Sequence, residues 1–295
     1  MKPSPALCLT LAFVLAASSV IAKPKPPPAA LPPGQPTDGD WRTPDPDNVL
    51  VIDTNKGRVF VELIPTVAPQ TVARIKQLTR GGVYNGRAFF RVLDNFMDQT
   101  GDPLDSGAGQ SSLPNIGPEF TFRRGPATPM VVLERSGGEE SGLIGSLPVQ
   151  SQTMDLGLLT VDHKVDAWGV FCPGVLGMAR SDDPSSGNSQ FFLMRTNSQS
   201  ADHGTHQIDK AYTAFGRVIA GQDVIDAIKV GEPVDAPQDQ MTSVKVLADM
   251  PAASRPKVRV IDPASAWMKA EAAREQADQG PDYTVCDLHL PVRVE

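Results

Sequence analysis

Residues 88–103 read AFFRVLDNFMDQTGDP, a stretch that carries one fixed positive charge, Arg91, among phenylalanines. The segment RAFFRV has the β-branched and aromatic character of a strand. A buried guanidinium costs free energy unless it is paired. Arg91 therefore has either a carboxylate partner, for which Asp94 and Asp98 are the nearest candidates in the sequence, or donors that are kept for a ligand.

The composition is that of an acidic globular protein. The chain has 295 residues, a formal net charge of −7 and 40% hydrophobic residues. We find no basic run, so a nucleic-acid partner is not expected, because binding to a phosphate backbone needs clustered Lys and Arg. The length suits one sizeable domain with additions, or two small domains.

The N-terminal region predicts targeting and spacing. Residues 1–22 combine Lys2, an apolar run and a small-residue end at Ala22, the pattern of a secretory signal peptide. The run is too short to span a membrane comfortably, so no stable membrane insertion is expected after cleavage; the alternative is an anchor helix that stays attached. Residues 23–46 are proline-rich and predict an extended linker. We expect an exported protein, periplasmic if the cell is Gram-negative.

Two cysteines, Cys172 and Cys286, would remain after signal cleavage. An exported protein can join such a pair in a disulfide. The sequence gives no distance between them, so the pairing stays open at this point.

From Asn48 onward the pattern is mainly β. NVLVIDT and RVFVELI are β-branched and alternate, and the NKG between them signals a hairpin. SQFFLMR, YTAFGRVIAG and MTSVKVLAD predict further strands. Two helices are expected, one beginning near Pro69 and the other ended by Gly231. Many strands, few helices and no βαβ alternation indicate an antiparallel barrel or sandwich.

Two regions are less regular. An insertion at about residues 124–173 includes RSGGEESGLIGS (135–146), which has the composition of a flexible surface loop. Residues 250–295 form a C-terminal extension, with a helix expected around 264–276, that should pack on the barrel.

The motifs between residues 49 and 249 resemble the cyclophilin family of peptidyl-prolyl cis-trans isomerases. They are TVAPQTVARI, FFRVLDNFMDQTGD, GMARS, NSQFF and FGRV, and as an ordered set they are highly specific. The resemblance implies a mainly β domain over residues 47–249, built as a closed eight-stranded antiparallel barrel capped by two α-helices. It also implies an isomerase that uses no cofactor or metal and acts on proline-containing polypeptides.

The resemblance assigns roles to residues of this sequence. Arg91 would be catalytic, and Gln99 would hold its guanidinium and contact the substrate backbone. The substrate-binding residues would be Phe96, Met97, Met178, Ala179, Arg180, Gln190, Phe192, Ile208 and Tyr212. Within this set, Phe96, Met97, Phe192 and Ile208 would line the slot for the proline ring, and the backbone beside Ala179 and Arg180 would pair with the peptide.

Three positions depart from the family pattern. Gln207 stands where the drug-sensitive cyclophilins have a pocket-rim tryptophan, which predicts weak cyclosporin binding. Tyr212 takes the place of a frequent pocket histidine, and a phenol offers both a ring face and a polar tip. Arg180 stands where many members have asparagine, which predicts a different substrate preference beside the peptide backbone.

Other classes of function have weaker support in the sequence. A peptide-binding or chaperone module of the same fold with little turnover is the main alternative. The feature that favours an enzyme is the joint retention of Arg91, Phe96, Gln99 and Phe192. His203 and His206 lie in a loop without a nearby cysteine or carboxylate ligand set, which disfavours a metal site. No Gly-x-Ser-x-Gly motif points to a serine hydrolase.

Overall fold

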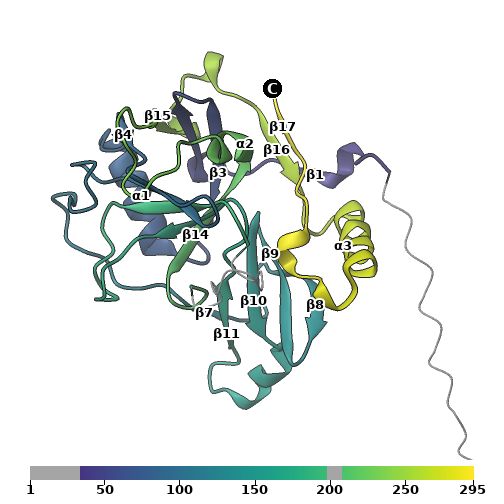
Figure 1. The fold of residues 1–295 in the computed structure, drawn as a ribbon. Coiled ribbons are helices and arrows are strands. Elements are labelled where there is room, and N and C mark those ends of the chain that lie inside the picture. The colour runs from purple at the N-terminus through teal and green to yellow at the C-terminus, as the bar shows by residue number, and fades with distance from the viewer. Residues whose placement is uncertain (1–33, 198–207) are drawn as a thin grey trace, which may run out of the picture.

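The computed structural model describes residues 34–197 and 208–295 (Figure 1). The strands are β1 (Trp41–Arg42), β2 (Val49–Thr54), β3 (Arg58–Leu63), β4 (Arg87–Ala88), β5 (Arg91–Val92), β6 (Met97–Thr100), β7 (Phe122–Arg124), β8 (Val131–Ser136), β9 (Glu139–Ile144), β10 (Leu147–Gln152), β11 (Val165–Gly169), β12 (Val175–Met178), β13 (Phe191–Met194), β14 (Thr213–Ala220), β15 (Gln240–Val246), β16 (Val258–Ile261) and β17 (Val292–Val294). The α-helices are α1 (Pro69–Arg80), α2 (Gln222–Asp226) and α3 (Ala266–Gln279).

The main sheet has nine strands in the order β4-β15-β2-β3-β14-β12-β13-β6-β5, with antiparallel pairing throughout. The predicted β2–β3 hairpin is confirmed, with Val49 opposite Glu62 and Asp53 opposite Arg58. Helix α1 begins at the predicted Pro69. It contributes Val72, Ile75 and Leu78 to the core cluster that the inner faces of these strands share.

The sheet curls into a half-barrel: the predicted mainly β architecture is confirmed, whereas the predicted closure into an eight-stranded barrel is not confirmed. In the described part of the chain, no hydrogen-bonded ladder joins β4 to β5, the two ends of the strand order. The two strands follow one another in the chain, and each pairs with a different partner, β4 with β15 and β5 with β6. The backbone of residues 231–234 bonds there instead, through Gly231 to Val92 and Val234 to Phe90. Non-local segments of this kind cannot be found from strand periodicity.

The insertion is ordered into a five-stranded sheet, β7-β11-β10-β9-β8, where the composition predicted a flexible loop. Gly137 and Gly138 both have positive φ angles and form the turn between β8 and β9, a role that suits glycine. The alternation is hidden because Glu140 is buried, neutralised by an ion pair of 2.5 Å with Arg124. A buried polar pair removes the hydrophobic signal that periodicity needs.

The chain ends meet in a third sheet, ordered β1-β16-β17. Trp41 and Arg42, which fall in the predicted linker, pair with Ile261 and Val260 of the C-terminal extension. The predicted extended tether therefore gives way to folded chain before residue 47, because the edge of β16 supplies the hydrogen-bond partners that a proline-poor segment can use.

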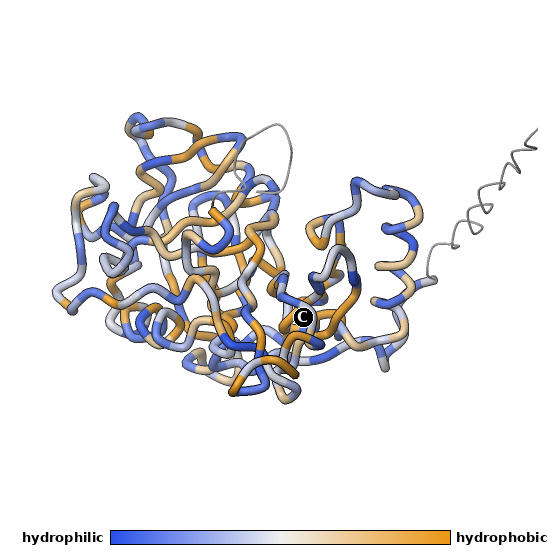
Figure 2. The backbone as a smooth tube through the Cα atoms, turned by 90° about the horizontal axis from the view of Figure 1, so that it is seen from below, coloured by the Kyte–Doolittle hydropathy of each residue, from blue (hydrophilic) through white to orange (hydrophobic). Residues whose placement is uncertain are grey.

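The C-terminal extension packs on the insertion sheet and on the half-barrel. Figure 1 shows α3 beside β8, and the Gln276 side chain donates to the Leu133 carbonyl at 3.0 Å. Cys172 and Cys286 form a disulfide with an S–S distance of 2.04 Å, which links the end of the insertion to the extension. Hydrophobic residues lie mostly in the interior of the fold, and hydrophilic residues lie mostly along its periphery (Figure 2). Among residues 34–197 and 208–295, no helix is both long and apolar enough to span a membrane.

Candidate active site

Arg91 and Gln99 are placed side by side by strand register. A tight turn closes where Leu93 and Met97 exchange backbone hydrogen bonds, and it sets Arg91 of β5 opposite Gln99 of β6. Arg91 Nη1 donates to Gln99 Oε1 at 3.3 Å. The hairpin therefore brings into contact two side chains that are eight positions apart in the sequence.

Arg91 is less buried than its sequence neighbours suggest, and its ionic partner differs from the expected candidates. Its side chain is 35% exposed, and its Nε lies 2.5 Å from Oε1 of Glu232, which is 52% exposed. Asp94 and Asp98 pair instead with Arg195, at 2.9 and 2.5 Å. An exposed pair of this type contributes little to stability, and it occupies only the Nε edge of the guanidinium.

A hollow of about 110 Å³ opens beside the guanidinium. Its lining comprises Arg91, Phe96, Met97, Gln99, Ala179, Arg180, Phe192 and Tyr212. We call this the proline hollow. Six of these residues are contributed by β5, β6, β13 and the segment after β12, so sheet pairing brings them together.

Aromatic contacts fix the wall of the proline hollow. The Phe192 ring stacks on Phe171 and meets Tyr212 edge-on, each with centroids 5.7 Å apart. The Arg180 guanidinium lies 4.6 Å from the Tyr212 ring centroid and 5.5 Å from that of Phe120. Cation–π contacts of this kind hold a long side chain in one place. Arg180 thus covers Tyr212 at one end of the hollow.

Three of the predicted substrate-binding residues lie outside the proline hollow. Met178 is 4% exposed and packs in the core cluster beneath the sheet, since side chains alternate along a strand and Ala179 takes the outer face. Ile208 packs against the second core cluster, which contains Phe192. Gln190 lines a neighbouring hollow.

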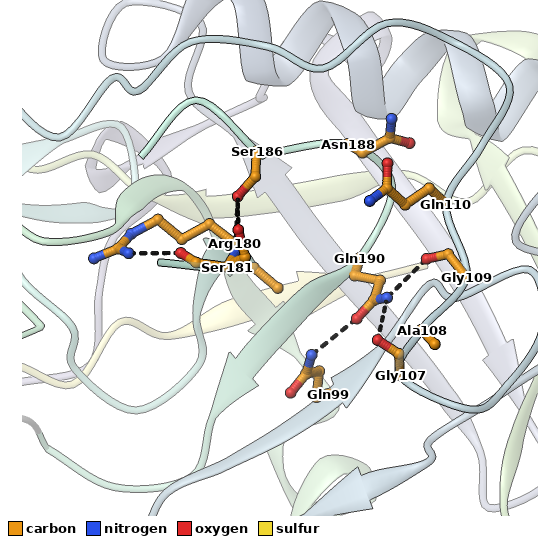
Figure 3. Close-up of a pocket in the computed structure, with 11 residues that line it drawn as sticks. Gln99, Gly107, Ala108, Gly109, Gln110, Arg180, Ser181, Ser186, Asn188 and Gln190 are labelled. Carbon is orange, nitrogen blue, oxygen red and sulfur yellow. Dashed lines mark hydrogen bonds between the residues drawn. The ribbon is translucent and has the colours of Figure 1, made fainter. Parts of the chain in front are cut away.

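That neighbouring hollow, of about 190 Å³, continues from Gln99, Ala179 and Arg180 (Figure 3). Gln99 donates to Gln190 Oε1 at 3.0 Å, and Gln190 donates to the carbonyls of Gly107 and Gly109 at 3.1 and 2.8 Å. Figure 3 shows this chain of hydrogen bonds, which leads from Gln99 through Gln190 to Gly107 and Gly109. The two hollows share Gln99, Ala179 and Arg180 and form one continuous groove, which we call the peptide groove.

The loop after β6 is held by a buried carboxylate. Asp102 is 0% exposed and accepts hydrogen bonds from the backbone N–H groups of Leu104, Ser106, Gly107 and Gly109. Burial by itself would raise the pKa of Asp102, but these four donors outweigh it and hold the pKa below the usual value. The Gly-Asp-Pro in the sequence marked a turn here, whereas the convergence of four donors was not visible.

Glu232 and Phe171 are the residues of this region that sequence reasoning missed. Glu232 is far from Arg91 in the chain, and only the pairing of residues 231–234 with Phe90 and Val92 brings it close. Phe171 lay in the segment interpreted as an irregular insertion. The Gly231 helix stop was the one signal near Glu232, and it gave no indication of a contact with Arg91.

Metal binding has no support from the described part of the chain, in which no group of three or more His, Cys, Asp or Glu side chains is placed to hold an ion. His203, His206 and Gln207 lie outside the described residues.

The fold and the joined hollows define a mainly β protein with a groove that combines an apolar slot with arginine and glutamine side chains. The model of the family described as cyclophilin type peptidyl-prolyl cis-trans isomerase/CLD matches residues 49–248. A probable peptidyl-prolyl cis-trans isomerase of Brucella suis biovar 1 is 32% identical over 202 residues, covering 65% of this chain and 76% of that protein. The peptidyl-prolyl cis-trans isomerase cyp18 of Streptomyces antibioticus is 28% identical over 183 residues, covering 62% and 83%.

A solved structure agrees with these sequence relatives. The cyclophilin AquaCyp293 from Hirschia baltica superposes with a TM-score of 0.77 at 32% identity, covering 86% of this chain and 93% of that one. The chain therefore belongs to the cyclophilin-type peptidyl-prolyl cis-trans isomerases, a family of enzymes.

Proposed function

We propose that this isomerase accelerates rotation about X-Pro bonds in exported proteins as they fold, with Arg91 stabilising the twisted amide. Rotation is slow because it destroys amide resonance, with a barrier of roughly 18–20 kcal/mol, and uncatalysed isomerisation takes tens to hundreds of seconds. No bond is made or broken, so the reaction needs neither a nucleophile nor a metal.

A hydrogen-bond donor can lower this barrier selectively. When the amide is half rotated, the prolyl nitrogen becomes pyramidal and regains its lone pair. A donor aimed at that nitrogen binds the twisted state more strongly than either planar state, and only such differential binding accelerates a reaction. Arginine suits this role because it is always charged and its donors form a rigid fork.

The position of Arg91 at the mouth of the proline hollow is the observation that carries the proposal. Its Nε is bound to Glu232 and its Nη1 to Gln99, while in the described part of the chain no hydrogen bond engages Nη2. The hydrogen bonds at Nε and Nη1 fix the orientation of the guanidinium. Its Nη2 donors then remain available to a substrate. Phe96, Met97 and Phe192 supply the apolar surface that a prolyl ring would contact.

Substitution of Arg91 tests the mechanism against the alternative of a binding module. For Arg91→Ala we expect kcat/KM for a short X-Pro peptide to fall about 100-fold, the range seen when one transition-state donor is removed, with peptide affinity changed by less than about threefold. The assay is isomerisation measured by exchange NMR, and affinity is measured by titration calorimetry. Arg123→Ala is the matched control because Arg123 lies outside the groove, in ion pairs with Asp162 and Asp166. An unchanged rate in Arg91→Ala would favour the binding module.

Export is a separate part of the proposal, supported by the signal pattern in residues 1–22. Expression of the full chain in a Gram-negative cell should yield a periplasmic protein whose measured mass corresponds to a chain that begins at Lys23. An intact N-terminus in the cytoplasmic fraction would contradict export without affecting the proposed chemistry.

A further inference from the structure

A second arginine, Arg217, shows the combination first considered for Arg91. Its guanidinium is partly withdrawn from water and, within the described chain, has no carboxylate partner. Arg217 lies on β14 and is partly buried, and its Nε and Nη1 make only long hydrogen bonds, of 3.3 Å to the Pro173 carbonyl and 3.4 Å to the Ser146 carbonyl. Desolvation lowers the pKa of Arg217 to about 10, which leaves it charged at neutral pH. A buried cation is costly unless something compensates its charge.

No carboxylate of residues 34–197 and 208–295 lies within ion-pair distance of Arg217. Glu62 is opposite Arg217 in the β3–β14 register, but both of its oxygens accept from Arg42, at 2.6 and 2.7 Å. Asp287 is near in the fold, but its Oδ2 accepts from the backbone and hydroxyl of Thr284. The nearby acids are therefore engaged elsewhere.

Arg217 lines a groove of about 600 Å³ between β14 and the C-terminal extension. The lining, which we call the Arg217 groove, consists of Pro173, Arg217, Val218, Ile219, Ala220, Gly221, Gln222, Cys286, Asp287, Leu288, His289, Leu290, Pro291 and Val292. It shares no residue with either hollow of the peptide groove. Its volume falls within the range of ligand pockets, about 300–1,000 Å³, and such pockets combine apolar walls with a few placed polar groups.

We propose that the Arg217 groove binds a monoanionic carboxylate with an apolar body. The carboxylate would accept hydrogen bonds from the Nη atoms of Arg217, whose planar fork matches its geometry. The apolar body would lie along Ile219, Leu290 and Val292. A single arginine and the nearby Asp287 carboxylate favour a ligand with one negative charge over a dianion such as phosphate.

The test uses hexanoate as the probe, on the full mature protein at constant ionic strength. Titration calorimetry should give saturable binding below about 20 mM, the affinity expected even at the low end of ligand efficiency for eight non-hydrogen atoms. Hexanol, which keeps the chain without the charge, and inorganic phosphate, which keeps charge without the chain, should each bind at least about tenfold more weakly.

Variants locate the binding. Arg217→Gln should weaken hexanoate binding about tenfold or more, whereas the matched control Arg123→Gln should leave it unchanged. If Arg217→Gln does not fold, amide chemical shifts of the wild-type protein give the same answer, since hexanoate should move resonances of residues 217–222 and 286–292. The proposal is overturned if hexanoate does not bind, if phosphate binds as tightly, if Arg217→Gln binds hexanoate as well as wild type, or if the shifts map to the peptide groove.

Discussion

The disulfide between Cys172 and Cys286 should be a major source of stability, because it closes a loop with a sequence separation of 114. In the chain-entropy description, a crosslink removes unfolded-state entropy of about 2.1 + 1.5R ln n cal/mol/K. With n of about 114 this gives ~16 cal/mol/K, or ~4.8 kcal/mol at 25 °C. The location adds to the effect, since Cys172 is 0% exposed and Cys286 belongs to the extension that covers the second core cluster.

The perturbation is the double variant Cys172→Ala/Cys286→Ala, which removes the crosslink without burying a hydroxyl. For a domain of this size, 1 kcal/mol shifts Tm by about 2–4 °C, so the melting temperature should fall by about 10–20 °C. Scanning calorimetry and urea unfolding measure the change. Wild type in dithiothreitol should fall by the same amount, whereas the double variant should not respond to the reductant, which controls for Cys8.

A refuting result would be equal melting temperatures for oxidised and reduced wild type. The extension would then be held by packing alone, through Met268, Ala272 and Leu288, and the loop-closure argument would be wrong for this chain.

Three further predictions concern the site. An alanine Cβ at Gly177 would lie 2.1 Å from Cζ of Phe192, whereas a normal carbon–carbon contact is about 3.5–4.0 Å. Gly177→Ala should therefore displace the Phe192 ring and destabilise the fold by about 1–3 kcal/mol. The substitution should also raise KM in the peptide assay. Glu232→Gln should lower kcat more than it raises KM, because it loosens the Nε anchor of Arg91. Because folding lowers the pKa of Asp102, its contribution to stability is present above its unfolded pKa of about 3.9 and is lost as the pH falls through the folded pKa; Asp102→Asn should flatten the acid limb of the urea midpoint measured against pH.

The Glu232 prediction has a control in the same loop, and each of the other two has an outcome that would contradict it. Asp235→Asn removes an acid from the loop that carries Glu232 and should leave kcat and KM unchanged; an equal effect of the two substitutions would indicate a general charge effect instead of an anchor. For Gly177→Ala, wild-type kinetics and stability would show that the Phe192 ring can move at no cost. For Asp102→Asn, an unaltered acid limb would assign the acid sensitivity to other carboxylates.

The sequence by itself determined the family, most of the main sheet and the residues that line the proline hollow. Ordered motifs and local periodicity sufficed, because the β2–β3 hairpin and the β5–β6 turn are short-range features that bring Arg91 and Gln99 together. The start of α1 at Pro69 was predicted for the same reason, since helix signals are local.

Only the tertiary structure decided how distant segments complete the molecule. The insertion sheet was hidden because the buried pair of Arg124 and Glu140 breaks the hydrophobic alternation of its strands. The half-barrel, the Glu232 anchor and the Arg217 groove depend on contacts between segments far apart in the chain. Sequence patterns report which face of an element is buried, but not which element covers it. They could not show that Arg91 is ion-paired with Glu232, or that the partly buried Arg217 has no carboxylate partner among the described residues.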